Sequence, residues 1–274
     1  MKTSGPKQVV ISGGFDDIKS RDLRFLEEAS KLGDVTVLLW PDAVLEKLAG
    51  QPPKFSFAER NYLLNAVRYV GKVVAADAAG DFNSLPKELR AEIWADRAAK
   101  QNSAREKFAA ENRIAYRVFT PDELSGFPEP PPMPSAPGRK KVVATGCYDW
   151  FHSGHVRFCE EASAYGDLYV CLGSDANVRL LKGAGHPLWP QDERRYVVGS
   201  IKFVKQALIT TGAGWVDADP EIQRLKPDFY LVNEDGDKGG KREYCQKLGI
   251  EYVVLKRAPA PGLPPRNSTS LRGF

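Results

Sequence analysis

The feature that most constrains the fold of this chain is an internal repeat. Residues 9–43 align without gaps on residues 142–176, and 17 of the 35 aligned pairs are identical. After a one-residue gap the match resumes, so that Glu59-Arg60 aligns with Glu193-Arg194. A repeat of this length indicates two copies of one structural unit along the chain. We therefore predict a tandem duplication of a single α/β unit.

Within each copy, short apolar stretches alternate with helical patterns. Such alternation is typical of a parallel sheet with helices on both faces, in which ligands bind at the carboxyl ends of the strands. The predicted fold class is α/β, with two tandem Rossmann-like, doubly wound parallel-sheet domains. In the second copy we expect strands at about residues 141–145, 168–173, 206–210, 229–233 and 252–256, and helices near residues 155–164, 175–181, 191–200, 220–225 and 238–248.

A Pro-rich segment separates the two copies. Its composition favours an extended, semi-rigid spacer. We therefore divide the chain into a first domain at residues 1–127, this linker at residues 128–140 and a second domain at residues 141–274. The total of 274 residues suits two domains of ordinary size.

Composition argues against several classes of protein. The formal net charge of +4 is small and basic residues are interspersed with acidic ones, which disfavours nucleic-acid binding. No apolar run approaches the length of a membrane span, and the first residues lack the apolar core of a signal peptide. All four cysteines lie in the second half, which indicates free thiols in a reducing compartment. We expect a cytoplasmic protein without membrane or nucleic-acid partners.

The second copy carries a pair of histidines where a strand is expected to turn into a helix. His152 and His155 follow the expected strand and open the expected helix, with Gly154 between them. Backbone N–H groups and the helix dipole favour anions at such a position. The i, i+3 spacing places both imidazoles on one face, and the glycine leaves room for a ligand near the backbone. The sequence therefore predicts a phosphate site at this helix start.

The first copy lacks this motif. Opposite the two histidines and the glycine it has, in order, Lys19, Asp22 and Arg21. We infer that the second copy is the working site and that the first is a scaffold or a partner surface. Two other interpretations stay open: the histidines have no catalytic role, or they bind zinc together with Cys147 or Cys159. The spacing is a weak zinc signature, so we assign no metal-binding residue.

Several motifs of the second copy together resemble those of the cytidylyltransferase-like nucleotidyltransferases, a Rossmann-like family with a His-x-Gly-His signature. The match runs in order over nearly all of residues 141–274. It is similar both to the ethanolamine-phosphate and glycerol-phosphate cytidylyltransferases and to the heptose-phosphate adenylyltransferases. The resemblance implies a catalytic set, His152, His155 and Lys182, and a nucleotide-binding set, Thr145, Gly146, Cys147, Tyr148, Phe151, Gly154, Asp175, Arg194, Asn233, Asp235, Ser268, Thr269 and Ser270.

The resemblance also implies a reaction. A phosphorylated small alcohol or sugar attacks the α-phosphorus of CTP or ATP, and pyrophosphate leaves. The two histidines would donate to phosphate oxygens, and Lys182 would bridge the attacking phosphate and the α-phosphate. Residues 268–270 would bind the β- and γ-phosphates at a helix start. Mg²⁺ would be held mainly through the substrate phosphates.

Departures from the family pattern leave the nucleotide open. The usual glycine of the family's Gly-x-Asp turn is Asn233, and Arg266 stands only two residues before Ser268, where relatives have a larger separation. A catalytically inactive, nucleotide-binding regulator is the alternative from another class. A synthetase-like adenylate former is a third possibility, although the chain lacks the second, Lys-rich loop of those proteins.

The two copies also predict an internal assembly. Enzymes of the family that this chain resembles are commonly homodimers, and two copies on one chain would associate at a high effective concentration. Residues 68–70 align with residues 202–204, a segment that some members place at their subunit interface. We expect an intramolecular pseudo-dimer through these segments, with further homo-oligomers possible. We also expect the first copy to bind no nucleotide.

Overall fold

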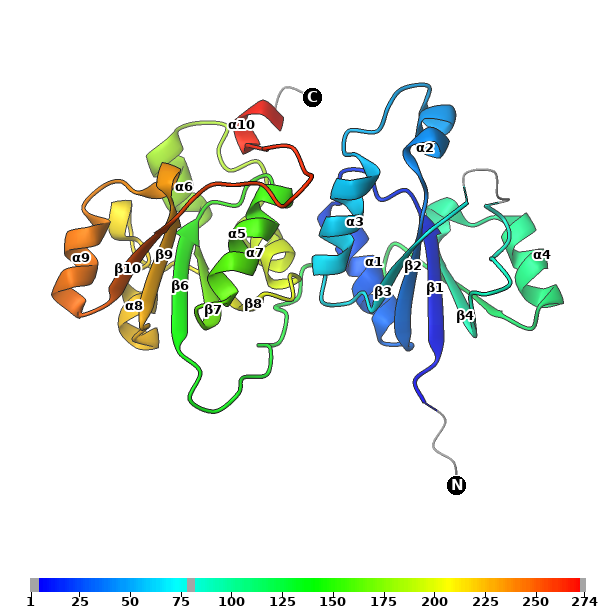
Figure 1. Cartoon of the computed structure of the whole chain (residues 1–274), viewed down its shortest axis with the longest axis horizontal. Coiled ribbons are helices and arrows are strands. Elements are labelled where there is room, and N and C mark those ends of the chain that lie inside the picture. The colour runs from blue at the N-terminus through cyan, green and yellow to red at the C-terminus, as the bar shows by residue number, and fades with distance from the viewer. Residues whose placement is uncertain (1–4, 78–81, 272–274) are drawn as a thin grey trace. The chain divides into compact units, whose positions relative to one another are not determined.

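The computed structural model describes residues 5–77 and 82–271. The chain forms two compact units, Met1–Gly126 and Phe127–Phe274. Each unit is an open sheet of five strands, all parallel, with helices packed around it (Figure 1). The predicted α/β class with two doubly wound parallel sheets is therefore confirmed.

The first unit has a sheet in the order β3-β2-β1-β4-β5. The central strands β1 and β2 are aliphatic and almost wholly buried, as expected when helices cover both faces of a parallel sheet. The strands are β1 (Gln8–Gly13), β2 (Asp34–Leu39), β3 (Lys72–Ala75), β4 (Ile93–Arg97) and β5 (Ala115–Phe119), and the helices are α1 (Ser20–Ser30), α2 (Asp42–Ala49), α3 (Phe57–Ala66), η1 (Ala98–Lys100) and α4 (Ser103–Glu111).

The second unit repeats this plan, with its strands in the order β10-β9-β6-β7-β8. Counted within each unit, the strand order is the same. The strands are β6 (Lys141–Gly146), β7 (Asp167–Leu172), β8 (Val204–Ile209), β9 (Phe229–Asn233) and β10 (Glu251–Leu255). The helices are α5 (Ser153–Ser163), α6 (Asp175–Lys182), α7 (Gln191–Gly199), η2 (Gly214–Val216), α8 (Asp219–Leu225), η3 (Glu234–Gly236), α9 (Lys241–Leu248) and α10 (Ser268–Leu271).

The topology places a binding edge at the carboxyl ends of β6 and β9. The chain leaves β6 for β7 and β8 on one side of the sheet and then crosses to β9 and β10 on the other. Strands that neighbour each other at such a reversal leave a crevice outside their carboxyl ends. The loop from β6 into α5, which carries both histidines, lies at this edge.

Helix α9 begins three residues later than the sequence pattern indicates. The expected start was residue 238, and the observed start is Lys241. Gly239 and Gly240 have φ values of 73° and 72°, in the left-handed region that an α-helix does not use. The two glycines therefore form a turn that re-aims the chain before the helix begins.

The Pro-rich segment, expected to be a spacer, belongs to the second unit and packs on α7 and β8. The ring of Phe127 lies 6.0 Å from that of Tyr196, and Pro130 is buried against Gly199. The N–H of Met133 donates to the carbonyl of Lys205 at 2.9 Å, on the edge strand of the sheet. We call residues 127–135 the strap. It is an integral part of this unit because its apolar side chains cover helix α7.

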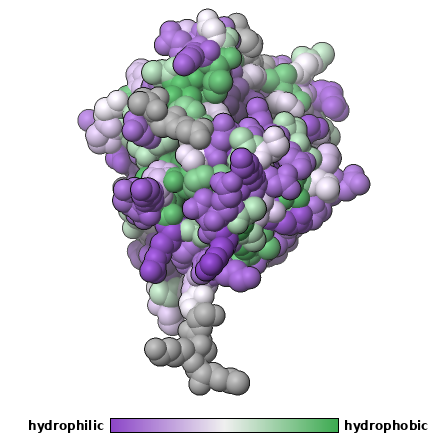
Figure 2. All heavy atoms as spheres, turned by 90° about the vertical axis from the view of Figure 1, so that its right-hand side faces the viewer, coloured by the Kyte–Doolittle hydropathy of each residue, from purple (hydrophilic) through white to green (hydrophobic). Residues whose placement is uncertain are grey.

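The surface of the molecule carries the charged residues that the composition requires. On the face drawn in Figure 2, hydrophilic side chains predominate and apolar ones form smaller groups between them. Among the helices that the structure describes, none is both long and apolar enough to cross a membrane.

Candidate active site

The two histidines form a reciprocal cap on the start of α5. His152 is the N-cap, and its Nδ1 accepts a hydrogen bond from the N–H of Gly154 at 3.1 Å. The Nδ1 of His155 accepts from the N–H of His152 at 3.3 Å. A neutral imidazole that accepts at Nδ1 carries its proton on Nε2. The fold therefore fixes the tautomer of both rings and makes each Nε2 a donor.

Gly154, which borders the cavity at the histidines, also has a role that the sequence did not indicate. A Cβ atom at this position would lie 2.9 Å from Cε1 of His152 and 3.0 Å from its Nδ1. The space above the glycine is thus taken by the imidazole of His152. Glycine is needed here so that the ring can reach the backbone N–H.

The two rings border a cavity of about 160 Å³ at the carboxyl ends of β6 and β9. Their centroids are 4.0 Å apart. His152 is only 2% exposed, and its Nε2 has no hydrogen-bond partner in the described part of the chain. A buried donor without a partner carries a desolvation cost that a ligand could relieve.

Both imidazoles are neutral at pH 7. Burial, together with the nearby guanidinium groups of Arg257 and Arg266, lowers the pKa of His152 to about 4. Burial also holds the pKa of His155 well below its usual value, with further contributions from His152, Arg257 and Lys182. Cations around a pair of neutral donors favour the binding of an anion.

The loop before the histidines is held by contacts of its own. Tyr148 adopts a φ of 54°, its side chain is buried, and its ring covers Gly146. Asp149 accepts from the N–H groups of Leu188 at 2.6 Å and Trp189 at 3.1 Å. Phe151 stacks on His155 at 5.4 Å. Of the predicted nucleotide-binding residues, Tyr148 and Phe151 thus support the loop, and Tyr148 also lines the cavity.

Arg194, predicted to bind nucleotide, lies in the protein interior. It is 1% exposed, and its guanidinium donates to the carbonyls of Cys147, Gly173 and Trp189 at 2.7–2.9 Å. It also pairs with Asp175 at 2.7 Å. Through these contacts Arg194 connects α7 to the loop that carries the histidines and, by its ion pair with Asp175, to the start of α6.

The first unit confirms that this arrangement belongs to the fold. The aligned Arg60 is 2% exposed and pairs with Asp42 at 2.6 Å. It donates to the carbonyls of Gly14, Trp40 and Phe55, which align with those contacted by Arg194. Because the first unit has the same interactions without the histidines, these contacts serve the structure of both units.

Lys182 is exposed at the end of α6, close to the histidine cavity. Its charge acts on His155, and it lowers the pKa of the neighbouring Cys147 thiol, which burial raises overall. Cys147 lines the cavity together with Thr145 and Gly146. The structure therefore brings Lys182 to the β7 side of the site.

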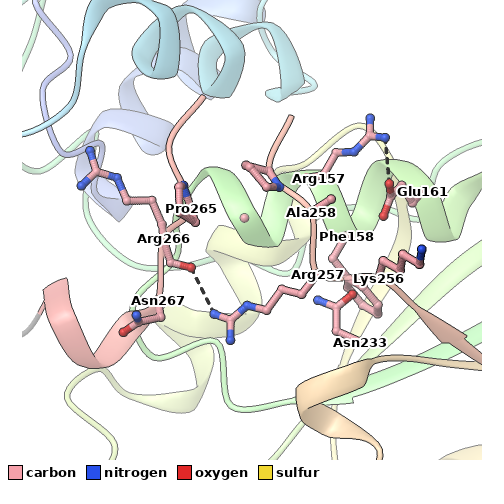
Figure 3. Close-up of a pocket in the computed structure, with 12 residues that line it drawn as sticks. Arg157, Phe158, Glu161, Asn233, Lys256, Arg257, Ala258, Pro265, Arg266 and Asn267 are labelled. Atoms are coloured by element: carbon pink, nitrogen blue, oxygen red, sulfur yellow. Dashed lines mark hydrogen bonds and ion pairs between the residues drawn. The ribbon is translucent and has the colours of Figure 1, made fainter. Parts of the chain in front are cut away.

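A second cavity, of about 310 Å³, adjoins the first and shares Gly154, Phe158, Asn233 and Arg257 with it. Figure 3 shows Arg257 extended across this cavity to the backbone of Arg266, and the distance from its guanidinium to that carbonyl is 3.1 Å. Arg257 also pairs with Asp235. Three further cations border the cavity, namely Arg157, Lys256 and Arg266.

The sequence motifs missed two cations of the site, Arg257 and Lys241. Arg257 lies just beyond the end of β10, and Lys241 is the first residue of α9. Their positions carried a signal. Residues just beyond the carboxyl end of a strand, such as Arg257, and the first residue of a helix that follows a strand, such as Lys241, lie at the binding edge of a parallel sheet. Both line the histidine cavity.

The predicted residues near the C-terminus are only partly described. Asn233 borders both cavities, and Asp235 borders the smaller one. The hydroxyl of Ser268 donates to the carbonyl of Trp150, at 3.2 Å, in the loop that carries the histidines. The side chains of Thr269 and Ser270 lie outside what the structure describes. Within the described residues, no group of three His, Cys, Asp or Glu side chains could hold a metal ion.

In the first unit, ion pairs occupy the position that corresponds to the histidine site of the second unit. Asp22, which aligns with His155, accepts from the N–H of Lys19 at 2.9 Å and so preserves the helix cap. Its other oxygen pairs with Arg97 at 2.8 Å. Asp17 lies between the ammonium groups of Lys19 and Lys54, at 2.8 and 2.9 Å. The cations there are neutralised by the protein's own carboxylates.

Comparison with known proteins places the second unit in a family. Residues 143–261 match the family described as cytidylyltransferase-like. A FAD synthase from Ferroglobus placidus is 38% identical over 120 residues, which are 43% of this chain and 75% of that protein. The bifunctional protein HldE of Aliarcobacter butzleri is 34% identical over 122 residues, which are 43% of this chain and 24% of that protein.

Among solved structures, a lipopolysaccharide core biosynthesis protein from Thermoplasma volcanium matches 45% of this chain and 99% of its own, with 23% identity and a TM-score of 0.38. This chain spans about a quarter of the length of the HldE protein and three quarters of the FAD synthase. Through its second unit, the chain belongs to the cytidylyltransferase-like family of nucleotidyltransferases.

Proposed function

We propose that the second unit transfers a nucleoside monophosphate from ATP or CTP to the phosphate of a small phosphorylated alcohol or sugar and releases pyrophosphate. The observation that carries this proposal is the pair of imidazoles at the start of α5. Each is held through Nδ1 by a backbone N–H, which leaves Nε2–H as the donor. Fixed donors in a partly buried anion site suit a substrate whose negative charge shifts during reaction.

In the proposed reaction, an acceptor phosphate oxygen forms a bond to the α-phosphorus. The bond from that phosphorus to the oxygen that bridges to the β-phosphate breaks, and pyrophosphate leaves. His152 and His155 would donate from Nε2 to phosphate oxygens. A bound phosphate raises the pKa of a nearby imidazole, so neutral donors would gain positive character as charge develops. Lys182 would offset the charge of the attacking phosphate.

Mg²⁺ fits this site as an ion that arrives on the triphosphate. The carboxylate that lines the histidine cavity, Asp235, is paired with Arg257. The ion would then be held mainly by phosphate oxygens and water, as Mg²⁺ commonly is, and would neutralise the leaving pyrophosphate.

ATP is the donor that we propose to test first. The relative named FAD synthase makes, by its name, a product that contains adenylate, and it matches this chain over three quarters of its length. CTP remains the second candidate, since the matched family is described as cytidylyltransferase-like. A phosphorylated acceptor is common to both versions of the reaction.

We further propose that the two units arose by duplication and that the first has lost its nucleotide site. The shared strand order and the aligned Arg60 and Arg194 support the duplication. The ion pair of Asp22 with Arg97 supports the loss, because a carboxylate at the helix start repels phosphate.

The test is a panel of nucleoside triphosphates against phosphorylated acceptors, read as pyrophosphate release. We expect release for one nucleotide with one acceptor class, and its loss in His152→Ala and His155→Ala. Nucleotide binding without pyrophosphate release for any acceptor would favour a regulatory protein instead. Release at the wild-type rate in both variants would exclude the histidine pair as the site.

A further inference from the structure

Lys241 is a cation of the histidine cavity that none of the family motifs includes. It is half-buried and lines the cavity beside Val232 and Asn233, at the end of β9. The left-handed turn at Gly239 and Gly240 directly precedes it and sets where α9 begins. The left-handed turn at the two glycines thus places this ammonium at the binding edge of the sheet.

The ammonium of Lys241 is incompletely satisfied by the protein. It donates to the carbonyl of Gly236 at 3.0 Å. Among the described residues this carbonyl is its one hydrogen-bond acceptor, so two of its three N–H bonds remain for a ligand. Burial lowers the pKa of Lys241, although the carboxylates of Asp237, Asp217 and Asp235 oppose that shift.

Those carboxylates are committed to other donors. Asp237 accepts from Tyr252 at 2.9 Å and from Arg242 at 3.4 Å. Asp217 accepts from the hydroxyl of Thr210 at 2.7 Å, and Asp235 pairs with Arg257. None of these carboxylates therefore pairs directly with the ammonium of Lys241. An anion bound in the cavity would neutralise that charge.

The corresponding cation of the first unit is neutralised by a carboxylate. Ile114 donates to the carbonyl of Ala109 as Ile250 donates to that of Cys245, which places Arg105 opposite Lys241. The aligned residues that both units share, such as Arg60 and Arg194, serve the fold. Arg105 pairs with Asp96 at 2.7 Å, whereas Lys241 donates to a backbone carbonyl. Only the unit with the histidines therefore presents this cation to an anion.

The position of Lys241 indicates which part of a substrate it meets. Lys182 comes from α6, which follows β7, and Lys241 comes from α9, which follows β9. Strand β6, whose end leads to the histidines, lies between β7 and β9 in the sheet. The two lysines therefore reach the histidine site from opposite sides of β6.

We propose that Lys241 is a catalytic residue that binds the α-phosphoryl group of the nucleotide, on the side of the site opposite Lys182. This inference rests on the proposed nucleotidyl transfer. Negative charge is concentrated on the α-phosphoryl oxygens and the leaving pyrophosphate while the bond to the acceptor forms. A fixed cation at that point stabilises the transition state more than the bound substrates.

The test compares Lys241→Met and Lys241→Arg with a matched control, Lys238→Met. Lys238 lies in the same turn but is exposed and does not border the cavity. We expect Lys241→Met to lower kcat by ~10² or more, in the range for loss of one charged donor. Lys241→Arg should recover part of this loss. The kcat of Lys238→Met should stay within about twofold of wild type, because substitutions of exposed residues usually have small effects. The affinity for AMP and CMP, which carry the α-phosphate alone, should fall in Lys241→Met and not in the control when it is measured by calorimetry.

Several outcomes would overturn the inference. A kcat of Lys241→Met close to that of wild type would refute it, as would a loss that appears only in the KM of the acceptor. Equal losses in the Met and Arg variants together with a lowered Tm would assign Lys241 a structural role. If wild type turns over no pair of substrates, the proposed reaction fails. Binding of AMP and CMP then decides on Lys241 separately, and equal affinities in wild type and Lys241→Met would reject it.

Discussion

At the level of single residues, the helix cap of the histidine motif separates structure from chemistry. His155 in the second unit and Asp22 in the first accept the N–H of the aligned N-cap residue, at 3.3 and 2.9 Å. Either side chain therefore closes the first turn of its helix. The imidazole adds an Nε2–H donor, whereas the carboxylate adds negative charge.

This equivalence gives a sharp substitution test. We expect His155→Asn and His155→Asp to retain the cap and to melt within a few degrees of wild type. Both should lose activity by ~10²–10³, since each removes one donor to the phosphate. The aspartate variant should also bind nucleotide more weakly than the asparagine variant, because its charge repels phosphate. The Tm, kcat and nucleotide Kd of the two variants test this prediction. An unchanged kcat in both variants would contradict it.

The buried histidine also predicts how stability depends on pH. The pKa of His152 is about 4 in the folded chain and near 6.5 when unfolded, so between these values the unfolded state binds more protons. The free energy of unfolding should therefore fall as the pH drops from about 6.5 toward 4, by on the order of 3 kcal/mol. Urea unfolding at several pH values should show a shallower dependence for His152→Asn.

Residue roles were the part of the site that the sequence could not fully predict. The motif placed His152, His155 and Lys182 at one edge, and the structure brings them together. The motif also included Arg194, which is buried and used by backbone carbonyls. Sequence spacing cannot tell which way a side chain points. The repeat does indicate a structural role for Arg194, because the aligned Arg60 occurs in the unit without the histidines.

At the level of secondary structure elements, most of the fold was predictable from sequence. Strands such as β6 and β9 are short aliphatic runs, and their predicted positions agree with the structure to within a residue. The strap was not predictable, because proline content indicates an extended chain but not what that chain contacts. The strap contacts Gly199 and the edge strand β8, which lie about 70 residues further along the chain.

We predict that the strap stabilises the second unit through Gly199. A Cβ at this position would lie 2.9 Å from Cγ of Pro130, so a side chain must displace the strap. Gly199→Val should lower the free energy of unfolding by about 1–3 kcal/mol, as overpacking usually does. In a Pro130→Ala background the same substitution should cost less, since its steric partner is smaller. Denaturant unfolding of the wild type, the two single variants and the double variant measures the energetic coupling between the two positions. Additive changes in the free energy of unfolding would show that the strap does not pack on Gly199.

At the level of the whole molecule, the first prediction concerns stoichiometry. In the first unit, Asp22 is paired with Arg97 where the second unit has His155 and Asn233. We expect one nucleotide bound per chain, as measured by calorimetry with a non-hydrolysable analogue. Asp22→His should leave this number at one, because Arg97 remains and the residue aligned with Gly154 is still Arg21. Two nucleotides per wild-type chain would show that the first unit retains a working site.

The second prediction at this level is that the two units associate as an internal pseudo-dimer. Its basis is the aligned pair of segments at residues 68–70 and 202–204. Because a tether gives the units a high effective concentration, association requires only a modest interface. The fragment to study begins at Phe127, so that it keeps the strap and loses only the first unit. We expect this fragment to be less soluble or much less active than the whole chain, and cross-links in the whole chain to join the two segments. A monodisperse, fully active fragment would instead establish that the units are independent.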